Sequence, residues 1–263
     1  MSTPAVSVRG VSKVFATRGD DVHALNDVSI DVADGEFITL IGPSGCGKST
    51  LLNLVAGLLP TSAGEVFVQG RPVLGPPNAV GMMFQKPVLL DWRTVLGNVL
   101  LPIEMAGGRG AARAATPRAM ELLSSVGLDG FDKRYPRELS GGMQQRAAIC
   151  RMLIGDPEVL LMDEPFGALD ELTREKLNLQ FDRIVEQTKK TSILVTHNIQ
   201  EGVFLSDRVV VMSARPGRII GVVPVSLPRP RTLDMVTTEG FLTLMNSVRG
   251  YLELGSASDE AVA

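Results

Sequence analysis

The sequence predicts an α/β fold whose parallel strands carry polar side chains at their carboxyl ends. A strand-like apolar run over residues 37–41 leads directly into the glycine-rich residues 42–50, and helical apolar spacing begins at Leu51. Two later apolar runs, residues 159–162 and 192–196, also end in polar residues. Because open parallel sheets bind ligands at the carboxyl ends of their strands, this fold class also predicts where a site lies.

The glycine-rich segment fits the phosphate-loop pattern, with Gly42 and Gly47 at the fixed spacing before Lys48 and Ser49. Glycines let the backbone curl so that successive N–H groups point into one cavity, and the start of the following helix favours an anion. Lys48 can reach terminal phosphates, and the Ser49 hydroxyl can bind Mg²⁺. The predicted loop consists of Gly42, Pro43, Ser44, Gly45, Cys46, Gly47, Lys48, Ser49 and Thr50. A purely structural turn rarely has a strand before it and Lys-Ser plus a helix after it, so a nucleotide site is strongly favoured.

Composition excludes several other classes of protein. The 263 residues are 44% apolar and 21% charged, which is typical of a soluble globular chain with one large or two small domains. The net charge is −3 without a strongly basic block, which argues against nucleic acid as the main partner. The two cysteines lack a metal-ligand spacing and fit a reducing compartment. We find no signal peptide and no apolar run of about 18 residues, so membrane association needs a partner.

Two consecutive carboxylates, Asp163 and Glu164, follow the apolar run of residues 159–162. A carboxylate at the end of a strand beside a phosphate loop is placed to hold Mg²⁺. The next carboxylate can orient and deprotonate a water molecule. A solvated acidic turn is the alternative interpretation, and the four apolar residues before the pair make it the weaker one.

Two further polar residues end predicted strands. Gln85 follows a strand over residues 79–84, although an amide there is equally typical of a surface turn. His197 follows residues 192–196 and is expected at the same sheet edge as the carboxylates. The other histidine, His23, is expected in a surface turn.

A second glycine-rich helix start lies farther along the chain. Ser140 is a good N-cap, and Gly141 and Gly142 open a helix that runs to about Ile154. Free N–H groups without side chains in the way form an anion site. Such a start can be purely structural, but in a chain that already has a phosphate loop it favours a second functional site.

Two aromatic residues have both a structural and a functional interpretation. Phe15 ends one of several short strands expected before residue 42, and either packs in the core or stacks on a base; its spacing alone favours the core. Trp92 follows the apolar residues 88–90 in a predicted connection. A contact patch and ordinary packing explain it equally well.

Together these residues resemble the ATP-binding cassette (ABC) superfamily over about residues 5–253. The order matches that family: a phosphate loop at 42–50, a glutamine at 85, a signature at 139–146, a Mg²⁺ strand at 159–164, a loop at 168–170 and a switch histidine at 197. Residues 92–95, 165–170 and 227–231 look most like the nitrate, sulfonate and taurine importer group. Two residues depart from that group: Asp91 stands where proline is usual, and Asn198 stands where aspartate often follows the histidine.

The resemblance implies an α/β fold with a RecA-like phosphate-loop ATPase core, an antiparallel β subdomain and an inserted helical subdomain. One ABC-type nucleotide-binding domain is expected over residues 1–253. Its helical subdomain is expected at roughly 88–155, and a C-terminal linker and helix at 226–253. Residues 254–263 are expected to form a flexible tail.

It also implies that two copies bind head to tail around two ATP molecules. In one copy Phe15 would stack on adenine and residues 42–50 would wrap the phosphates. The implied catalytic residues are Lys48, Gln85, Glu164 and His197, and the implied Mg²⁺ ligands are Ser49, Gln85 and Asp163. From the other copy, Ser140, Gly141 and Gly142 would close on the γ-phosphate, with Asp170 at the dimer seam.

The implied activity is ATP hydrolysis coupled to uptake of a small solute, such as nitrate, a sulfonate, taurine or a related organic compound. The partners would be transmembrane permease subunits and, through them, a solute-binding protein, with this chain peripheral on the cytoplasmic face of the inner membrane. Two alternatives stay open. A soluble non-transport ABC ATPase usually carries two fused cassettes or a long coiled coil, and a phosphate-loop kinase does not need residues 139–146.

Overall fold

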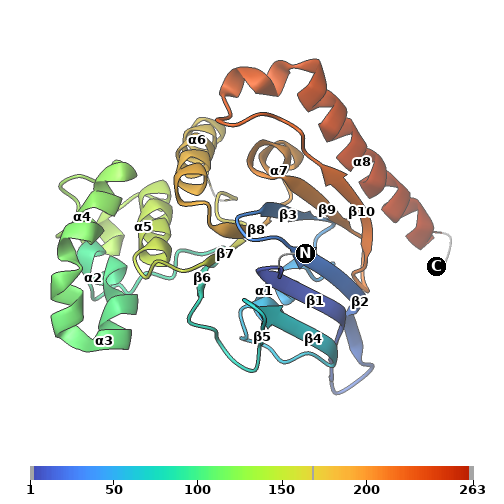
Figure 1. Ribbon diagram of the computed structural model, residues 1–263, viewed down its shortest axis with the longest axis horizontal. Helices are drawn as coiled ribbons and strands as arrows, with labels where there is room; N and C mark the ends of the chain where they lie inside the picture. Colours follow the sequence, from blue (N-terminus) through green and yellow to red (C-terminus); the bar gives the residue numbers. More distant parts are fainter. Residues whose placement is uncertain (1–2, 168, 261–263) are drawn as a thin grey trace.

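Two β-sheets form the centre of the fold, and helices pack on both faces of the larger one (Figure 1). The computed structural model describes residues 3–167 and 169–260. The smaller sheet is antiparallel. Its order is β2 (Val22–Val32), β1 (Val6–Phe15), β4 (Ala63–Val68) and β5 (Arg71–Pro72). Two of the short strands predicted before residue 42, over residues 6–8 and 11–15, are one strand in the structure. Register shifts at Val8/Val11 and beyond let β1 continue through Gly10, whose φ is 57°. His23 lies in β2 and not in the predicted turn.

The larger sheet carries the predicted parallel strands. Its order is β10 (Ile219–Pro224), β9 (Arg208–Met212), β3 (Phe37–Ile41), β8 (Thr191–Val195), β7 (Val159–Asp163) and β6 (Val80–Met83). Every neighbouring pair is parallel except β9 and β10. All residues of β3 and β8 are buried, as expected for strands covered on both faces. The sheet therefore brings the ends of β3, β6, β7 and β8 to one edge.

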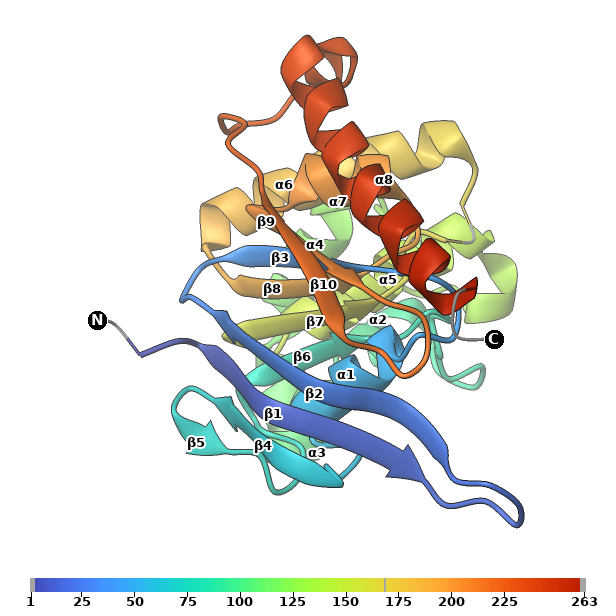
Figure 2. The same cartoon turned by 90° about the vertical axis from the view of Figure 1, so that its right-hand side faces the viewer.

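Helices cover the two faces of the larger sheet. Helix α1 (Lys48–Val55) lies between the two sheets, as Figure 2 shows, and packs with Ile38 and Leu40. On the opposite face, Phe37 and Ile41 pack in the cluster formed by α6 (Glu171–Thr188), α7 (Ile199–Leu205) and α8 (Glu239–Glu260). Because side chains alternate along β3, one strand serves both cores. Helix α8 continues past residue 253, where the sequence predicts its end, and residues 261–263 lie outside the described part.

A third core belongs to helices that stand beside the sheets in Figure 1. These helices are α2 (Val95–Val99), α3 (Leu101–Ala114), α4 (Thr116–Ser125) and α5 (Gly141–Leu153), and a 3₁₀ turn, η1 (Pro136–Glu138), precedes α5. Helix α5 contributes Ala147 and Cys150 to this third core. It also contributes Ala148 and Met152 to the core that contains Phe37. It therefore joins the helical part of the chain to the sheets.

Two arginines of the predicted linker, residues 228–231, bind the end of α7. Arg231 is buried and donates to the carbonyl oxygens of Val203, Phe204 and Ser206 at 3.0, 2.6 and 2.8 Å. Arg229 pairs with the buried Asp182 of α6 and donates to the Leu205 carbonyl. The last carbonyls of a helix have no partner within it, and these guanidinium groups supply one. A second 3₁₀ turn, η2 (Leu233–Thr237), follows.

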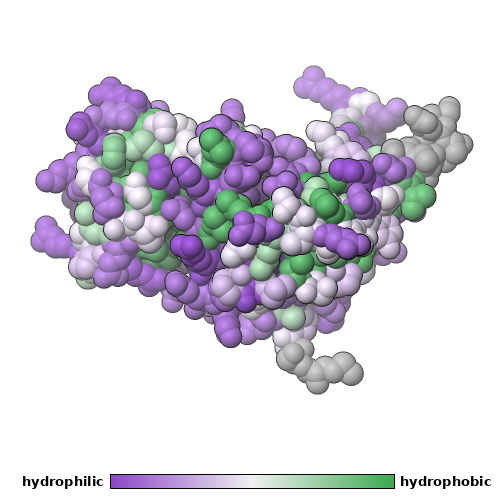
Figure 3. Space-filling view, turned by 90° about the horizontal axis from the view of Figure 1, so that it is seen from above, coloured by the Kyte–Doolittle hydropathy of each residue, from purple (hydrophilic) through white to green (hydrophobic). Residues whose placement is uncertain are grey.

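In the ranges 3–167 and 169–260, no helix is both long enough and apolar enough to cross a bilayer. On the face seen in Figure 3, hydrophobic residues form separate patches among hydrophilic ones.

Candidate nucleotide-binding site

The predicted phosphate loop connects β3 to α1 with backbone angles that require glycine. Gly45 and Gly47 have φ values of 74° and 100°, in the left-handed region that side chains disfavour. A Cβ on Gly42 would lie 2.8 Å from the Met212 carbonyl oxygen. The pattern of glycines therefore follows from the tight curl of the loop against β9.

Lys48 begins α1 and folds back over the loop. Its Nζ donates to the carbonyl oxygens of Gly42 and Pro43, both at 2.7 Å, and only 6% of the residue is exposed. These acceptors are neutral, whereas phosphate oxygens are charged and form stronger bonds to an ammonium group. Lys48 is therefore held inside the loop, where a phosphate group can replace its carbonyl partners.

A cavity of about 370 Å³ opens beside the loop and collects most of the predicted residues. It lies at the carboxyl ends of the parallel strands, as the fold class predicts. Its lining comprises Phe15, Val22, Ala24, Ser44, Gly45, Cys46, Gly47, Lys48, Ser49, Thr50, Gln85, Asp163, Glu164 and Arg215. Segments more than a hundred residues apart in sequence thus form one pocket.

Ser49 and Asp163 form the part of the site that suits a divalent cation. The Ser49 hydroxyl donates to Oδ1 of Asp163 at 2.8 Å. Burial raises the pKa of Asp163, the bond from Ser49 opposes this, and the negative charge of Glu164 adds to it. A hydroxyl, a carboxylate and the nearby Gln85 amide are oxygen donors of the kind that Mg²⁺ uses together with phosphate and water. The residues present fit that ion.

Glu164 is held between Gln85 and His197. Gln85 Nε2 donates to Oε2 of Glu164 at 3.1 Å, and His197 Nδ1 lies 3.4 Å from Oε1. The φ of Glu164 is 45°, a value that costs a non-glycine residue on the order of 1 kcal/mol and that is common at functional sites. His197 does not line the cavity itself, but it contacts this carboxylate from the end of β8.

Phe15 lines the cavity and is exposed, so the core interpretation that its spacing favours is wrong. The ammonium of Lys13 lies 5.1 Å from its ring centroid. Phe15 is the last residue of β1, and its ring is available as a stacking surface.

Sequence reasoning missed two residues of the site. Arg215 lines the cavity and donates to the Gly45 carbonyl through Nε and Nη2, at 3.3 and 3.2 Å. Its only sequence signal is an Arg-Pro-Gly turn after a strand. Glu201 is buried in α7. Its carboxyl accepts a hydrogen bond from the hydroxyl of Thr196, the residue before His197. Burial raises the pKa of Glu201 to about 7, although its bond to Thr196 opposes the shift.

Asn198 stands where the importer group often has aspartate, and it caps α7. Its side-chain oxygen accepts from the Glu201 N–H at 3.1 Å. Asparagine and aspartate are both strong N-cap residues, so the departure leaves the start of α7 intact.

The signature residues lie apart from the cavity of their own chain. Ser140 caps α5 by accepting from the Met143 N–H at 3.3 Å, and both Ser140 and Gly141 are exposed. Asp170 is also exposed and caps α6 through the Thr173 N–H at 3.0 Å. Among the residues described as lining the cavity, none comes from 139–146 or from the loop that contains Asp170. Residue 168 of that loop lies outside the described ranges.

Trp92 is a surface residue. Its exposed fraction is 75%, and that of Val88 is 56%. Arg151 of α5 donates to the carbonyls of Pro87 and Val88, both at 2.7 Å, and so fixes the backbone before the tryptophan. Of the two interpretations that the sequence leaves open, exposure rules out core packing.

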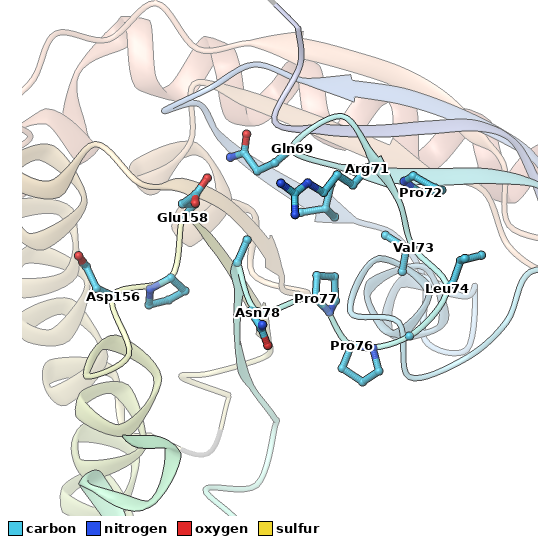
Figure 4. A pocket seen from close by; sticks show the side chains of 14 residues that line it. Gln69, Arg71, Pro72, Val73, Leu74, Pro76, Pro77, Asn78, Asp156 and Glu158 are labelled. Carbon is cyan, nitrogen blue, oxygen red and sulfur yellow. The ribbon is translucent and has the colours of Figure 1, made fainter. Parts of the chain in front are cut away.

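A larger cavity, of about 850 Å³, lies at the opposite end of the parallel strands. Figure 4 shows the side chains of Arg71, Pro77 and Glu158 around it. It borders the residues just before β6 and β7, whereas the loop and the carboxylates follow the strand ends. The smaller cavity is therefore the candidate nucleotide site.

Comparison with known proteins agrees with this geometry. The family model described as "ABC transporter" matches residues 25–167. The chain belongs to the ABC transporter family. It is 43% identical to the aliphatic sulfonates import ATP-binding protein SsuB of Bacillus cereus, covering 95% of this chain and 96% of that protein. It is 49% identical to the taurine import ATP-binding protein TauB of Rhizobium johnstonii, over 82% of each chain.

The fold of this ABC protein is similar to that of solved cassettes. One is a dimeric ATP-binding cassette in a post-hydrolysis state, bound to ADP and Pi; the TM-score is 0.74 at 29% identity, covering 85% of this chain and all of that one. These findings confirm the family, the fold class and the ATPase activity that the sequence predicts. The importer subunits among the relatives favour transport over a non-transport ABC ATPase.

Proposed function

We propose that this ABC ATPase is the nucleotide-binding subunit of an importer and works as a head-to-tail homodimer. One observation supports the dimer: the signature residues of a chain lie apart from the cavity of the same chain. The cavity contains the loop, the metal donors and Glu164, while Ser140, Gly141 and Gly142 lie outside it, and Ser140 and Gly141 are exposed. A second copy can bring these three residues and Asp170 to the first copy's ATP, and the similarity to a dimeric cassette supports this arrangement.

In the proposed site the loop, the aromatic ring and the metal donors bind different parts of the nucleotide. The N–H groups of residues 42–50 and the Lys48 ammonium bind the β- and γ-phosphates. Phe15 stacks on the adenine, and Ser49, Gln85 and Asp163 hold Mg²⁺. That ion neutralises charge on the phosphates when it is bound.

Hydrolysis then depends on Glu164 and His197. Glu164 accepts a proton from the attacking water, and Gln85 and His197 fix its two oxygens. His197 also reaches the γ-phosphate. The protein accelerates the reaction by positioning and by electrostatic stabilisation, without a covalent intermediate.

Binding and hydrolysis of ATP close and reopen the dimer. ATP binds the closed dimer more tightly than the open one, and this difference in affinity limits how far the equilibrium moves. The helical subdomain, over roughly residues 88–155, presents Val88 and Trp92 on the surface, where they contact the permease subunits. The chain is thus peripheral on the cytoplasmic face of the inner membrane, and a solute-binding protein joins the complex through the permease.

The solute is a small compound that carries a sulfonate group, such as an alkylsulfonate or taurine. Nitrate and other small organic compounds are further candidates. The names of two relatives that share 43% and 49% of their aligned residues with this chain support that class.

Reconstitution tests the proposal. The complex with its permease subunits is placed in liposomes with ATP on the side of this chain, and uptake of taurine, an alkylsulfonate and nitrate is measured with a solute-binding protein present. Uptake should require ATP and should stop with Lys48→Ala, whereas Lys176→Ala, at an exposed lysine of α6, should keep it. Uptake that persists with Lys48→Ala would refute the proposal.

A further inference from the structure

The side chain of Gln145 connects two loops of the site from inside α5. It is buried, with 2% exposed, and Nε2 donates to the carbonyl oxygen of Gln85 at 3.3 Å and to that of Pro165 at 2.5 Å. No role in nucleotide binding follows from these contacts, because Gln145 does not line the cavity.

The amide orientation is fixed by its partners. Both are carbonyl oxygens, so only the nitrogen can face them. The other end, Oε1, is buried and has no donor among the residues that the structure describes. A buried acceptor without a donor is destabilising, so packing alone does not account for a glutamine here.

The two carbonyls belong to the backbone that carries the catalytic pair. The side-chain amide of Gln85 donates a hydrogen bond to Glu164, and Pro165 directly follows Glu164 in the chain. A displacement of Gln145 therefore moves the backbone of both partners in that bond. Because the positive φ of Glu164 is strained, its carboxylate depends on such external fixation.

The other end of α5 is the signature. The helix begins directly after Ser140 and is one continuous hydrogen-bonded element to Leu153. Ser140 and Gln145 are five residues apart, which is about 7 Å along a helix. Because α5 packs in two cores, it connects the helical part of the chain, which includes the signature, to the sheets that carry the site.

We propose that Gln145 is a positioning residue that couples the two ATP sites of the dimer. When Ser140 engages the ATP held by the partner, α5 is fixed, and Gln145 then fixes the Gln85 and Glu164 backbones of its own subunit. Each site thereby becomes competent when the other is occupied. The inference rests on the proposed dimer, because only there does Ser140 reach an ATP molecule.

The test replaces Gln145 by methionine, which has similar length and volume but no donor. Its control is Gln187→Met, which makes the same exchange at an exposed glutamine of α6. Turnover is measured against ATP concentration, together with binding of a fluorescent ATP analogue to the isolated subunit and the melting temperature. Gln145→Ala serves as the second variant if methionine prevents folding.

For Gln145→Met we expect turnover to fall by about tenfold and the Hill coefficient to fall from the wild-type value toward 1, with analogue affinity within about twofold. A merely structural role lowers the melting temperature without changing the Hill coefficient. Retained turnover and cooperativity in Gln145→Met, the same losses in Gln187→Met, or non-cooperative hydrolysis by the wild type would overturn the coupling. Failure of Glu164→Gln to dimerise with ATP overturns the proposed dimer, a separate outcome.

Discussion

Gln85 Nε2 lies 3.1 Å from Oε2 of Glu164 and donates a hydrogen bond to it. The two residues follow neighbouring parallel strands, in which Met83 of β6 pairs with Met162 of β7. Strand register therefore sets the distance between them before any ligand is bound. His197 contacts the other oxygen of the same carboxylate at 3.4 Å, so the geometry of Glu164 is fixed on both sides.

Glu164→Gln should retain ATP binding and nearly abolish hydrolysis. The amide oxygen still accepts from Gln85, while the base for the attacking water is lost. ATP and Mg²⁺ should then trap a dimer, which light scattering after size exclusion measures. Glu121→Gln, at an exposed glutamate of α4, is the control and should keep wild-type turnover. A strictly monomeric Glu164→Gln protein with normal turnover would contradict the assignment.

Ser140→Arg should leave ATP binding by the isolated subunit unchanged and abolish its hydrolysis, because Ser140 acts on the ATP of the partner. Ser124→Arg, at an exposed position of α4, controls for the added charge. Mixing Ser140→Arg with Lys48→Ala leaves one composite site intact and the other doubly altered. Little hydrolysis is expected in the mixture, because the coupling inferred for Gln145 leaves the intact site incompetent while the altered site is empty. Full activity of Ser140→Arg alone would exclude the role of Ser140.

Trp92→Ala should weaken assembly with the permease without destabilising the isolated subunit. The side chain is 75% exposed, so its removal leaves no cavity, whereas loss of a central aromatic from an interface costs about 2 kcal/mol of binding. Co-purification with the permease and thermal melting measure the two effects. Leu74→Ala, which removes a 95% exposed apolar residue far from this patch, should affect neither. A large fall in the melting temperature of Trp92→Ala would argue against a contact surface.

Glu201→Gln should change the pH dependence of stability. Burial raises the pKa of Glu201 from 4.5 to about 7, with Arg174 and His197 opposing and Glu164 adding to the shift. The folded state therefore favours the neutral carboxyl, so this stabilisation is complete below about pH 4.5 and is lost as pH rises through about 7. The glutamine variant lacks this loss.

Relative to wild type, Glu201→Gln should therefore gain roughly 2–3 kcal/mol of unfolding free energy between pH 5 and pH 8. Urea unfolding at both pH values measures the unfolding free energy of each protein. Because variant and wild type are compared at the same pH, the titration of the other groups cancels. Glu121→Gln should show the same difference from wild type at both pH values. A difference for Glu201→Gln that is also independent of pH would show that the carboxyl titrates normally.

The sequence predicts the phosphate loop well because its geometry is local. Residues 42–50 are consecutive, and strand, glycines and helix are all visible in one stretch. Asp163 is predictable for a related reason. The apolar run of residues 159–162 indicates a buried strand, and the first polar residue after such a run marks the strand end. The side chains of the loop and of Asp163 consequently lie in one cavity.

Residues whose role depends on distant packing are not predictable in this way. Arg215 reaches Gly45 from 170 positions away, and only the β9–β10 connection explains the contact. Glu201 looks like an ordinary polar residue of a short helix, and only the packing of α7 buries it. The core interpretation of Phe15 is wrong because a strand pattern does not show that β1 ends at that residue, beside the cavity.

The arginine contacts at the end of α7 bear on where a functional ABC subunit can be truncated. Every residue of the nucleotide cavity precedes position 216, and the matching family model ends at residue 167. Yet α7 begins two residues after His197, and its last carbonyls bind Arg231. A protein cut after β10 would retain every phosphate-binding group but leave Asp182 as a buried charge without its cation. The smallest chain that holds His197 in place therefore extends well beyond the last residue that lines the cavity.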